Sequence, residues 1–286
     1  MAWRRRVSTG GIAVAAMLLA AAVMGAGTAR ADDDAAWKAA HDTDPHIPLT
    51  PYQQQKRADK IQRIAAQASA SGQPVTADPN APAGAAVVPD GTSTATAPTA
   101  ASVAANQVAQ ITSYYCGPAA EKEALGQFGI VHTQATMANQ LGTTTDGTAW
   151  SGGPTSTGHP IPDVLNSYAG VWIYYIPEAV PGSPSSGDIS NYKSFIVEDI
   201  GVESGPLVGD AWETSSSTYH LVGHPHDRTI FHWFDIRGYN TSGANTLYED
   251  SVHNATSVSW YAGVPAYSTL SSTAIVHIVG GRGYVW

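Results

Sequence analysis

The chain has 286 residues, a formal net charge of −9 at pH 7 and 43% hydrophobic residues, among them eight tryptophans. This composition is typical of a globular protein with a packed core, and the acidic excess disfavours nucleic acids and anionic membranes as partners. The chain cannot form an internal disulfide, because Cys116 is its single cysteine.

The first 31 residues have the layout of a secretory signal peptide. Three arginines precede an apolar run over residues 11–23, and Ala29-Arg30-Ala31 follows as a small-residue cleavage site. The run is too short for a good membrane span, so we expect secretion without a stable membrane anchor. Residues 1–31 carry four arginines and no acid, so their removal changes the formal charge from −9 to −13.

Two segments follow the signal peptide. In residues 32–72, Thr50 with Pro51 and Gln53 predicts the start of a helix that closes at Gly72. This helix is either a pro-segment that covers a site or a loosely attached spacer, and the sequence does not separate the two. Residues 73–105 contain no aromatic residue and are dominated by Ala, Pro, Thr, Ser and Gly, which predicts a flexible linker.

Residues 106–286 hold six of the eight tryptophans and form one predicted domain. Capping residues and hydrophobic periodicity predict helices first and strands afterwards. The predicted helices cover residues 117–128, 133–142, 162–168 and 188–200, the predicted strands cover 171–176, 206–210, 232–239 and 246–250, and a short helix and a strand occupy 268–286. This order predicts an α+β fold in which N-terminal helices pack against an antiparallel sheet.

Cys116 stands immediately before the first of these helices. Free N–H groups and the positive end of the dipole at a helix N-terminus favour the thiolate, the form that attacks carbonyl groups. Gln110, six residues earlier, can direct an amide N–H towards the oxygen of the attacked carbonyl and complete an oxyanion hole with the Cys116 N–H. The alternative is that Cys116 is an inert, buried small hydrophobe.

The run Gln110…Cys116-Gly117-Pro118-Ala119 resembles the papain-like cysteine peptidases, and most of all their bacteriocin-processing, double-glycine-peptidase-like branch. The resemblance implies a papain-like fold, in which the helix of the nucleophile and a sheet that carries the base face each other. It also implies that Cys116 is the nucleophile of peptide-bond hydrolysis through an acyl-enzyme.

A nucleophilic cysteine needs a base, and ten histidines compete for that role. The candidates that remain after the local context is considered are His220, His224, His226, His232 and His253. His232 opens an apolar strand that ends in Gly238-Tyr239, which is similar to the family's pattern. We therefore predict that His232 is the base.

The third member of the triad should come from the next strand. The sum of facing residue numbers is constant in an antiparallel pair, so a turn centred near 241 or 242 places Asp250 opposite or diagonal to His232. A turn centred at 242.5 would place His253 there and send Asp250 to the other face. We predict Asp250 as the acid, with Glu249 and Asn240 as weaker candidates.

Two rival functions remain open from the sequence. The first is a metal cluster, because imidazole and carboxylate are common ligands of zinc. Its members would be His220, His224, His226 and His232 with Asp210 and Asp227. The second is a secreted binding domain that keeps a peptidase scaffold without turnover.

The sequence therefore predicts a secreted cysteine peptidase with Cys116, His232, Asp250 and Gln110 as its catalytic residues. The expected partner is a peptide or protein substrate, and we expect no cofactor, no metal and no nucleic acid. The substrate's identity, the cleavage specificity and the oligomeric state do not follow from the sequence.

Overall fold

The computed structural model describes residues 34–70, 97–168 and 173–286. Their central feature is a seven-stranded sheet of order β2-β7-β3-β4-β5-β6, in which β1 also pairs with β4 and all pairs are antiparallel. The strands are β1 (Ala101–Ser102), β2 (Pro177–Ala179), β3 (Leu207–Glu213), β4 (Ile230–Asn240), β5 (Asn245–Glu249), β6 (Tyr267–Ser271) and β7 (Gly283–Val285).

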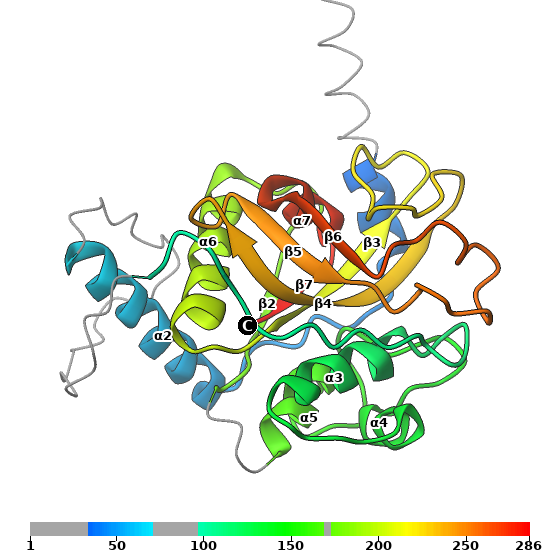
Figure 1. Ribbon diagram of the computed structural model, residues 1–286, viewed down its shortest axis with the longest axis horizontal. Helices are drawn as coiled ribbons and strands as arrows, with labels where there is room; N and C mark the ends of the chain where they lie inside the picture. The colour runs from blue at the N-terminus through cyan, green and yellow to red at the C-terminus, as the bar shows by residue number, and fades with distance from the viewer. Residues whose placement is uncertain (1–33, 71–96, 169–172) are drawn as a thin grey trace, which may run out of the picture.

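Helices cover both faces of this sheet, with α3, α4 and α5 on one side and α6 and α7 on the other (Figure 1). A short helix over residues 34–41 comes first. The others are α2 (Pro51–Ala70), α3 (Cys116–Gln127), α4 (Gln134–Leu141), α5 (Pro160–Ser167), α6 (Ser186–Ile196), the π-helical η1 (Val197–Val202) and α7 (Ser272–Ile278). The predicted α+β fold is confirmed.

Alternate residues of β4 pack into two separate hydrophobic cores. Phe234 and Ile236 are buried in the core that contains α6 and α7, whereas Trp233 is buried in the core that contains Cys116 and α3. Burying a large apolar side chain stabilises a fold by about 1.5–3 kcal/mol, so each face contributes to docking its own helices. The second core fixes α3 against the strand that carries His232.

The sequence signals at the start of α2 and at both ends of α4 are confirmed, whereas Gly72, the predicted end of α2, lies outside the described residues. The Thr50 hydroxyl accepts a hydrogen bond from the Gln53 N–H, and the Gln53 side chain accepts one from the Thr50 N–H, which is the predicted capping box of α2. Thr133 caps α4, and Gly142 closes it with a positive φ of 66°. Such local hydrogen bonds depend on neighbours in the sequence, so sequence patterns identify them well.

The predicted strand over 171–176 is wrong. Residues 169–172 lie outside the described residues, and β2 begins only at Pro177. The Asn166 side chain accepts from the Tyr175 N–H and donates to the Tyr175 carbonyl, both at 2.8 Å. An amide side chain thus takes the place of a strand partner, and ladder pairing starts with the two bonds between Ile176 and Trp286.

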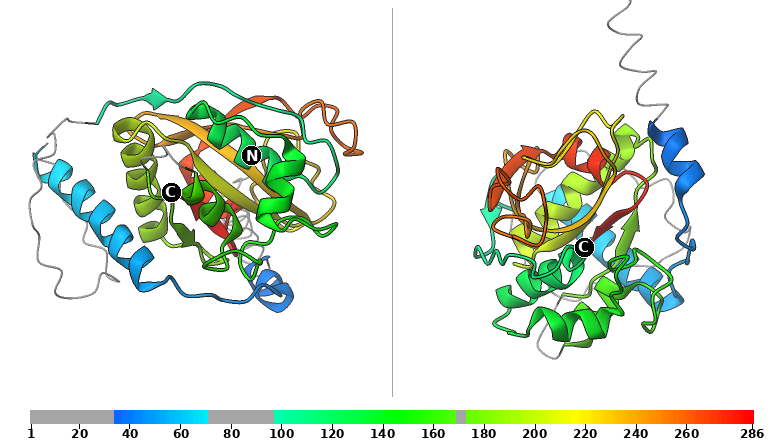
Figure 2. Two further views of the ribbon diagram at one scale, coloured as in Figure 1. Left: turned by 90° about the horizontal axis from the view of Figure 1, so that it is seen from below. Right: turned by 90° about the vertical axis from the view of Figure 1, so that its right-hand side faces the viewer.

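The segment that contains α2 packs on the domain. Lys60 forms a buried ion pair with Asp199 of η1 at 2.9 Å, and Arg57 binds Glu178 of β2 at 2.7 Å. Figure 2 shows α2 lying beside α6. The residues of α2 are absent from the lining of both cavities that contain Cys116, so α2 is not positioned over the thiol.

The structure describes only the C-terminal end of the predicted linker over residues 73–105. Residues 71–96 lie outside the described residues, but β1 pairs Ala101 with Tyr239 and Ser102 with Gly238. The sheet therefore begins before residue 106. The predicted signal peptide also lies outside the described residues, and within the described part of the chain no helix is both long and apolar enough to cross a membrane.

Candidate active site

Cys116 is the first residue of α3, as the sequence predicted, and its side chain is 8% exposed. The following residue has to be a glycine. A Cβ on Gly117 would lie 2.2 Å from Oγ1 of Thr148, so a side chain there would displace the loop that covers the start of α3. Thr148 in turn accepts a hydrogen bond from the indole of Trp233 at 2.9 Å. Gly117 therefore lets this loop close on the nucleophile's helix.

Gln110 lies in the same cavity as Cys116 and His232, a space of about 230 Å³. Its backbone N–H donates to the Ser251 carbonyl at 2.8 Å, and its side-chain oxygen accepts from the Ser251 hydroxyl at 3.2 Å. Its amide nitrogen donates to the Thr112 carbonyl at 2.8 Å. An amide nitrogen carries two protons, so one N–H remains for a substrate oxygen.

Two buried acids hold the segment that leads to Gln110. Glu249 accepts from the Asn106 N–H at 2.8 Å, and Glu123 of α3 accepts from the Val108 N–H at 2.8 Å. Asp235 is the cross-strand partner of Glu249. These acids tie the oxyanion candidate to α3 and to the sheet at once.

His232 interacts with both Asp250 and Cys116. Its Nε2 lies 3.1 Å from Oδ1 of Asp250, and both side chains are buried. The other ring nitrogen, Nδ1, is left to face Cys116, with which His232 also interacts. Burial acts to lower the pKa of His232, but the charge and hydrogen bond of Asp250, together with Cys116, raise it well above its ordinary value. This arrangement favours the charged imidazolium form of His232.

The register of the β4–β5 hairpin explains how Asp250 reaches His232. Next to the turn, Asn240 faces Asn245, which is the centre at 242.5 that would send Asp250 to the wrong face. A bulge between Ile236 and Gly238 shifts the register, so Asp235 faces Glu249 and the sum of facing numbers falls to 484. Asp250 then lies diagonal to His232 on the same face, as predicted for a centre at 242.

The weaker candidates for the third residue lie elsewhere. Glu249 contacts the backbone of Asn106, and Asn240 bonds to the side chains of Thr241 and Asn245. His253 is engaged in its own loop, where its Nδ1–H donates to the Val264 carbonyl at 2.8 Å. Asp250 is therefore the acid that the structure brings to His232.

Two further residues, His224 and Glu213, extend the hydrogen bonds of the site beyond Asp250. The sequence offered His224 as a candidate base and metal ligand and did not single out Glu213. Oδ2 of Asp250 lies 3.0 Å from Nε2 of His224, whose Nδ1 lies 2.8 Å from Oε2 of Glu213. Glu213 ends β3, and His224 lies in the loop before β4. No local motif links these positions, and only the pairing of β3 with β4 brings them together.

A cleft of about 630 Å³ opens beside Cys116. Its lining includes Trp150 and Trp233, whose rings stack with their centres 5.8 Å apart, and the buried carboxyl of Asp210. Burial raises the pKa of Asp210 to about 8, although the nearby Arg282 opposes the shift. A neutral carboxyl of this kind can both donate and accept hydrogen bonds near pH 7.

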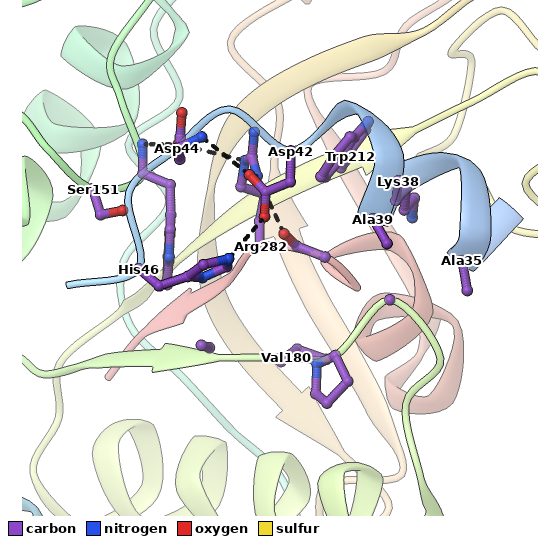
Figure 3. A pocket seen from close by; sticks show the side chains of 15 residues that line it. Ala35, Lys38, Ala39, Asp42, Asp44, His46, Ser151, Val180, Trp212 and Arg282 are labelled. Atoms are coloured by element: carbon purple, nitrogen blue, oxygen red, sulfur yellow. Dashed lines mark hydrogen bonds and ion pairs between the residues drawn. The ribbon is translucent and has the colours of Figure 1, made fainter. Parts of the chain in front are cut away.

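A second cavity of about 420 Å³ adjoins the cleft and shares Asp44, Trp150 and Arg282 with it. Figure 3 shows Asp42 and Asp44 directed towards Arg282, and the Arg282 guanidinium lies 2.8 Å from Asp42. Asp44, which belongs to the N-terminal segment, therefore forms part of the wall of the cleft that contains Cys116.

The predicted metal cluster is brought together only in part. Among the described residues, one group offers three ligand atoms within 4.8 Å of one another, namely His224, His232 and Asp250. Their atoms are already hydrogen-bonded to each other. His220 and His226 stack on each other instead, with ring centres 4.0 Å apart.

Comparisons with known proteins give a family match and a distant structural likeness. A search of the curated proteins finds no match. A crystal structure of a protein assigned to the C39-like peptidases, from Bacillus anthracis, has a TM-score of 0.40 and 10% identity, covering 65% of this chain and 96% of that one. The model of the Peptidase_C39 like family matches residues 103–284, which include Cys116, His232 and Asp250. Because that match spans more than half of the sequence, the chain belongs to the Peptidase_C39 like family.

Proposed function

We propose that this protein is a secreted cysteine peptidase that hydrolyses peptide bonds with Cys116 as nucleophile, His232 as base and Asp250 as the residue that orients the base. The observation that carries the proposal is the buried connection from Asp250 through His232 to Cys116 at the start of α3. Family membership supports the same reaction class.

The reaction begins from the thiolate and imidazolium pair. The Cys116 sulfur attacks the carbonyl carbon of the scissile bond, and the carbonyl oxygen becomes an oxyanion that accepts from the Cys116 N–H and the Gln110 amide. The C–N bond then breaks as His232 gives its proton to the leaving amine. Neutral His232 next takes a proton from water, the water oxygen attacks the thioester, and the C–S bond breaks to restore the thiolate.

The substrate that fits the site best is a peptide in an extended conformation. The cleft is lined by apolar rings of Trp150 and Trp233 and by the polar groups of Asp44 and Asp210. These groups offer stacking surface and hydrogen bonds to a peptide backbone. The excess of acidic residues over the whole chain disfavours nucleic acid as a partner.

Alkylation of the thiol tests the proposal before any substrate is known. The rate of reaction of Cys116 with iodoacetamide should remain high well below the ordinary thiol pKa, because the thiolate is paired with an imidazolium. Cleavage of a peptide library by the same preparation should stop after alkylation and should continue in the presence of a chelator. A slow thiol, or cleavage that a chelator abolishes, would reject the proposal.

Gln110→Ala should lower kcat about a hundredfold or more, because it removes one donor to the oxyanion. The thermal midpoint should change little, since the backbone bond between Gln110 and Ser251 remains. Peptide hydrolysis and thiol alkylation should be measured together. We expect alkylation to stay near the wild-type rate, and an unchanged kcat would show that Gln110 is not an oxyanion donor.

Removing the α2 segment should weaken the enzyme instead of activating it. A chain that begins at residue 97 keeps β1 but loses the ion pair of Lys60 with Asp199, and breaking a buried pair by removing one partner costs about 3–5 kcal/mol. We expect a thermal midpoint about 10 °C lower, with lower kcat/KM. Lys60→Met should reproduce part of the effect, and Lys56→Met, on the same helix, should not. Higher activity with an unchanged midpoint would instead identify the segment as an inhibitory pro-segment.

A further inference from the structure

A row of buried hydrogen bonds continues beyond the catalytic acid. Asp250 uses Oδ1 for His232 at 3.1 Å and Oδ2 for His224 at 3.0 Å, while the other nitrogen of His224 lies 2.8 Å from Glu213. Asp250, His224 and Glu213 are 1%, 3% and 0% exposed. Water therefore cannot replace any member of the row.

The donors and acceptors in this row determine where the protons are. Ionised carboxylates only accept hydrogen bonds, so each ring nitrogen of His224 must carry a proton when Asp250 and Glu213 are both charged. Glu213 also accepts from the Leu221 N–H at 2.5 Å, which suits an ionised carboxylate. His224 is then an imidazolium between two carboxylates, and charge alternates along the row.

The electrostatics of the buried groups agree with this assignment. Burial acts to lower the pKa of His224, but hydrogen bonds and charges of Asp250 and Glu213 raise it. Burial acts in the opposite direction on Glu213, whose pKa is nevertheless lowered to about 2 by His220, His224 and the Leu221 N–H.

We propose that His224 is a positioning residue of the peptidase, a permanently charged imidazolium held by Glu213 that keeps Asp250 ionised and oriented while His232 gains and loses its proton. This inference rests on the proposed function. It assigns a role to two residues that do not touch the substrate.

The acyl-enzyme stage shows why such a residue is useful. His232 has then given its proton to the leaving amine, so Asp250 no longer faces a cation on that side. A buried carboxylate without a cation tends to take up a proton or to rotate. His224 and the Val252 N–H, 2.9 Å from Oδ1, would hold Asp250 charged and aligned until His232 accepts a proton from water.

Other groups also face His224 and its partners. The rings of His232 and Trp260 approach His224 edge-on at 5.2 and 4.7 Å. His220 lies 3.6 Å from Glu213, the charge of Lys38 acts on Glu213, and the Tyr248 hydroxyl is affected by Asp250 and Glu213. Among these groups, only His224 lies between Glu213 and Asp250.

His224→Gln separates the charge from the hydrogen bond. A glutamine amide is neutral but can still donate to Oδ2 of Asp250. Loss of a cation in a buried site disfavours the thiolate and favours the protonated base. We therefore expect the curve of alkylation rate against pH to move to higher pH by about one pH unit, on both its acid and its alkaline limb. At a given pH on the acid limb, alkylation should then be about tenfold slower.

Two further variants complete the design. His226→Gln removes an exposed imidazole of the same loop and should leave both limbs in place. Glu213→Gln with His224→Gln avoids leaving a buried carboxylate unpaired, and it should show a smaller upward shift if the single variant does not fold, because the more distant lost anion offsets part of the effect of the lost cation. Nitrogen NMR of labelled histidine should show both ring nitrogens of His224 protonated at neutral pH, in a signal that His224→Gln removes.

The possible results are distinct. Limbs that stay in place, or a neutral His224 in the NMR spectrum, would overturn the proposal. A downward shift of the alkaline limb would contradict the charge assigned to His224, because it would mean that His224 aligns Asp250 without adding a cation to the site. None of these readouts needs a peptide, so a wild-type protein that cleaves no peptide would reject the proposed function and leave the assignment of His224 intact.

Discussion

Cys116→Ala should abolish peptide hydrolysis, with kcat reduced by at least about 10⁴-fold, because no other group in the cavity can form the thioester. The fold should persist, since the replacement is small and Cys116 lies at a helix start beside Gly117, whose close contact with Thr148 does not involve the sulfur. Hydrolysis of a fluorogenic peptide and the thermal midpoint check the two statements.

The matched variant is Cys116→Ser, which keeps a hydroxyl at the same position. A hydroxyl beside His232 remains protonated at neutral pH, so this variant should also be inactive although it retains the substrate-binding cleft. Activity that persists in either variant would end the interpretation as a cysteine peptidase. Binding of a library peptide by the inactive protein, without cleavage by the wild type, would instead favour the binding-domain interpretation.

His232→Ala should have the next largest effect. Without the imidazolium, Cys116 loses the cation that pairs with its thiolate and the leaving amine loses its proton donor, so kcat/KM should fall about 10⁴-fold. Asp250→Asn should be milder, because the shape is retained and only the charge that supports the imidazolium is removed. Peptide hydrolysis at a series of pH values measures both effects.

The sign of the pH dependence follows from the raised pKa of His232. The wild-type profile of kcat/KM should be bell-shaped, with an alkaline limb well above the ordinary histidine value, because activity is lost when the imidazolium loses its proton. Asp250 contributes the largest part of the upward shift, so Asp250→Asn should move this limb to lower pH. An alkaline limb that does not move in Asp250→Asn would exclude Asp250 as the partner of His232.

Much of the fold could be predicted from local sequence. Caps such as Thr133 and Gly142 act on residues a few positions away, so the pattern and the structure agree. The strand over 171–176 could not be placed correctly, because the Asn166 side chain makes the hydrogen bonds to the Tyr175 backbone that a neighbouring strand would make. The residue that pairs with Ile176 is Trp286, more than a hundred residues further along the chain. Long-range pairing decided this element, and local propensity did not.

The residues of the site also fall into those that the local sequence predicts and those that it does not. The position of Cys116 at a helix start follows from the residues after it, whereas the choice of Asp250 depended on a register that the turn alone would have set wrongly. The bulge before Gly238 has no strong sequence signal. His224 was a candidate base and metal ligand, but its place between Asp250 and Glu213 could not be predicted, because a loop and a neighbouring strand bring these residues together only in the folded chain.

Folding takes up protons at Glu249, which accepts from the Asn106 N–H, and at its cross-strand partner Asp235. Burial raises the pKa of Glu249 to about 7, against the Asn106 N–H and Arg237, and burial together with Glu249 raises that of Asp235 well above its ordinary value. In the unfolded chain both titrate near pH 4. The contribution of Glu249 to the free energy of unfolding is therefore full below about pH 4 and is lost as pH rises through about 7, and the contribution of Asp235 changes in the same direction.

Glu213 and Asp250 affect the pH dependence of the free energy of unfolding with the opposite sign. Glu213, with a pKa lowered to about 2, and Asp250, lowered further by its two histidines despite burial, stabilise the folded state above about pH 4 and lose that contribution only as pH falls. Folding therefore binds protons at one end of the β4–β5 hairpin and releases them at the site. From these carboxyl groups alone, the stability maximum lies on the acid side of neutrality.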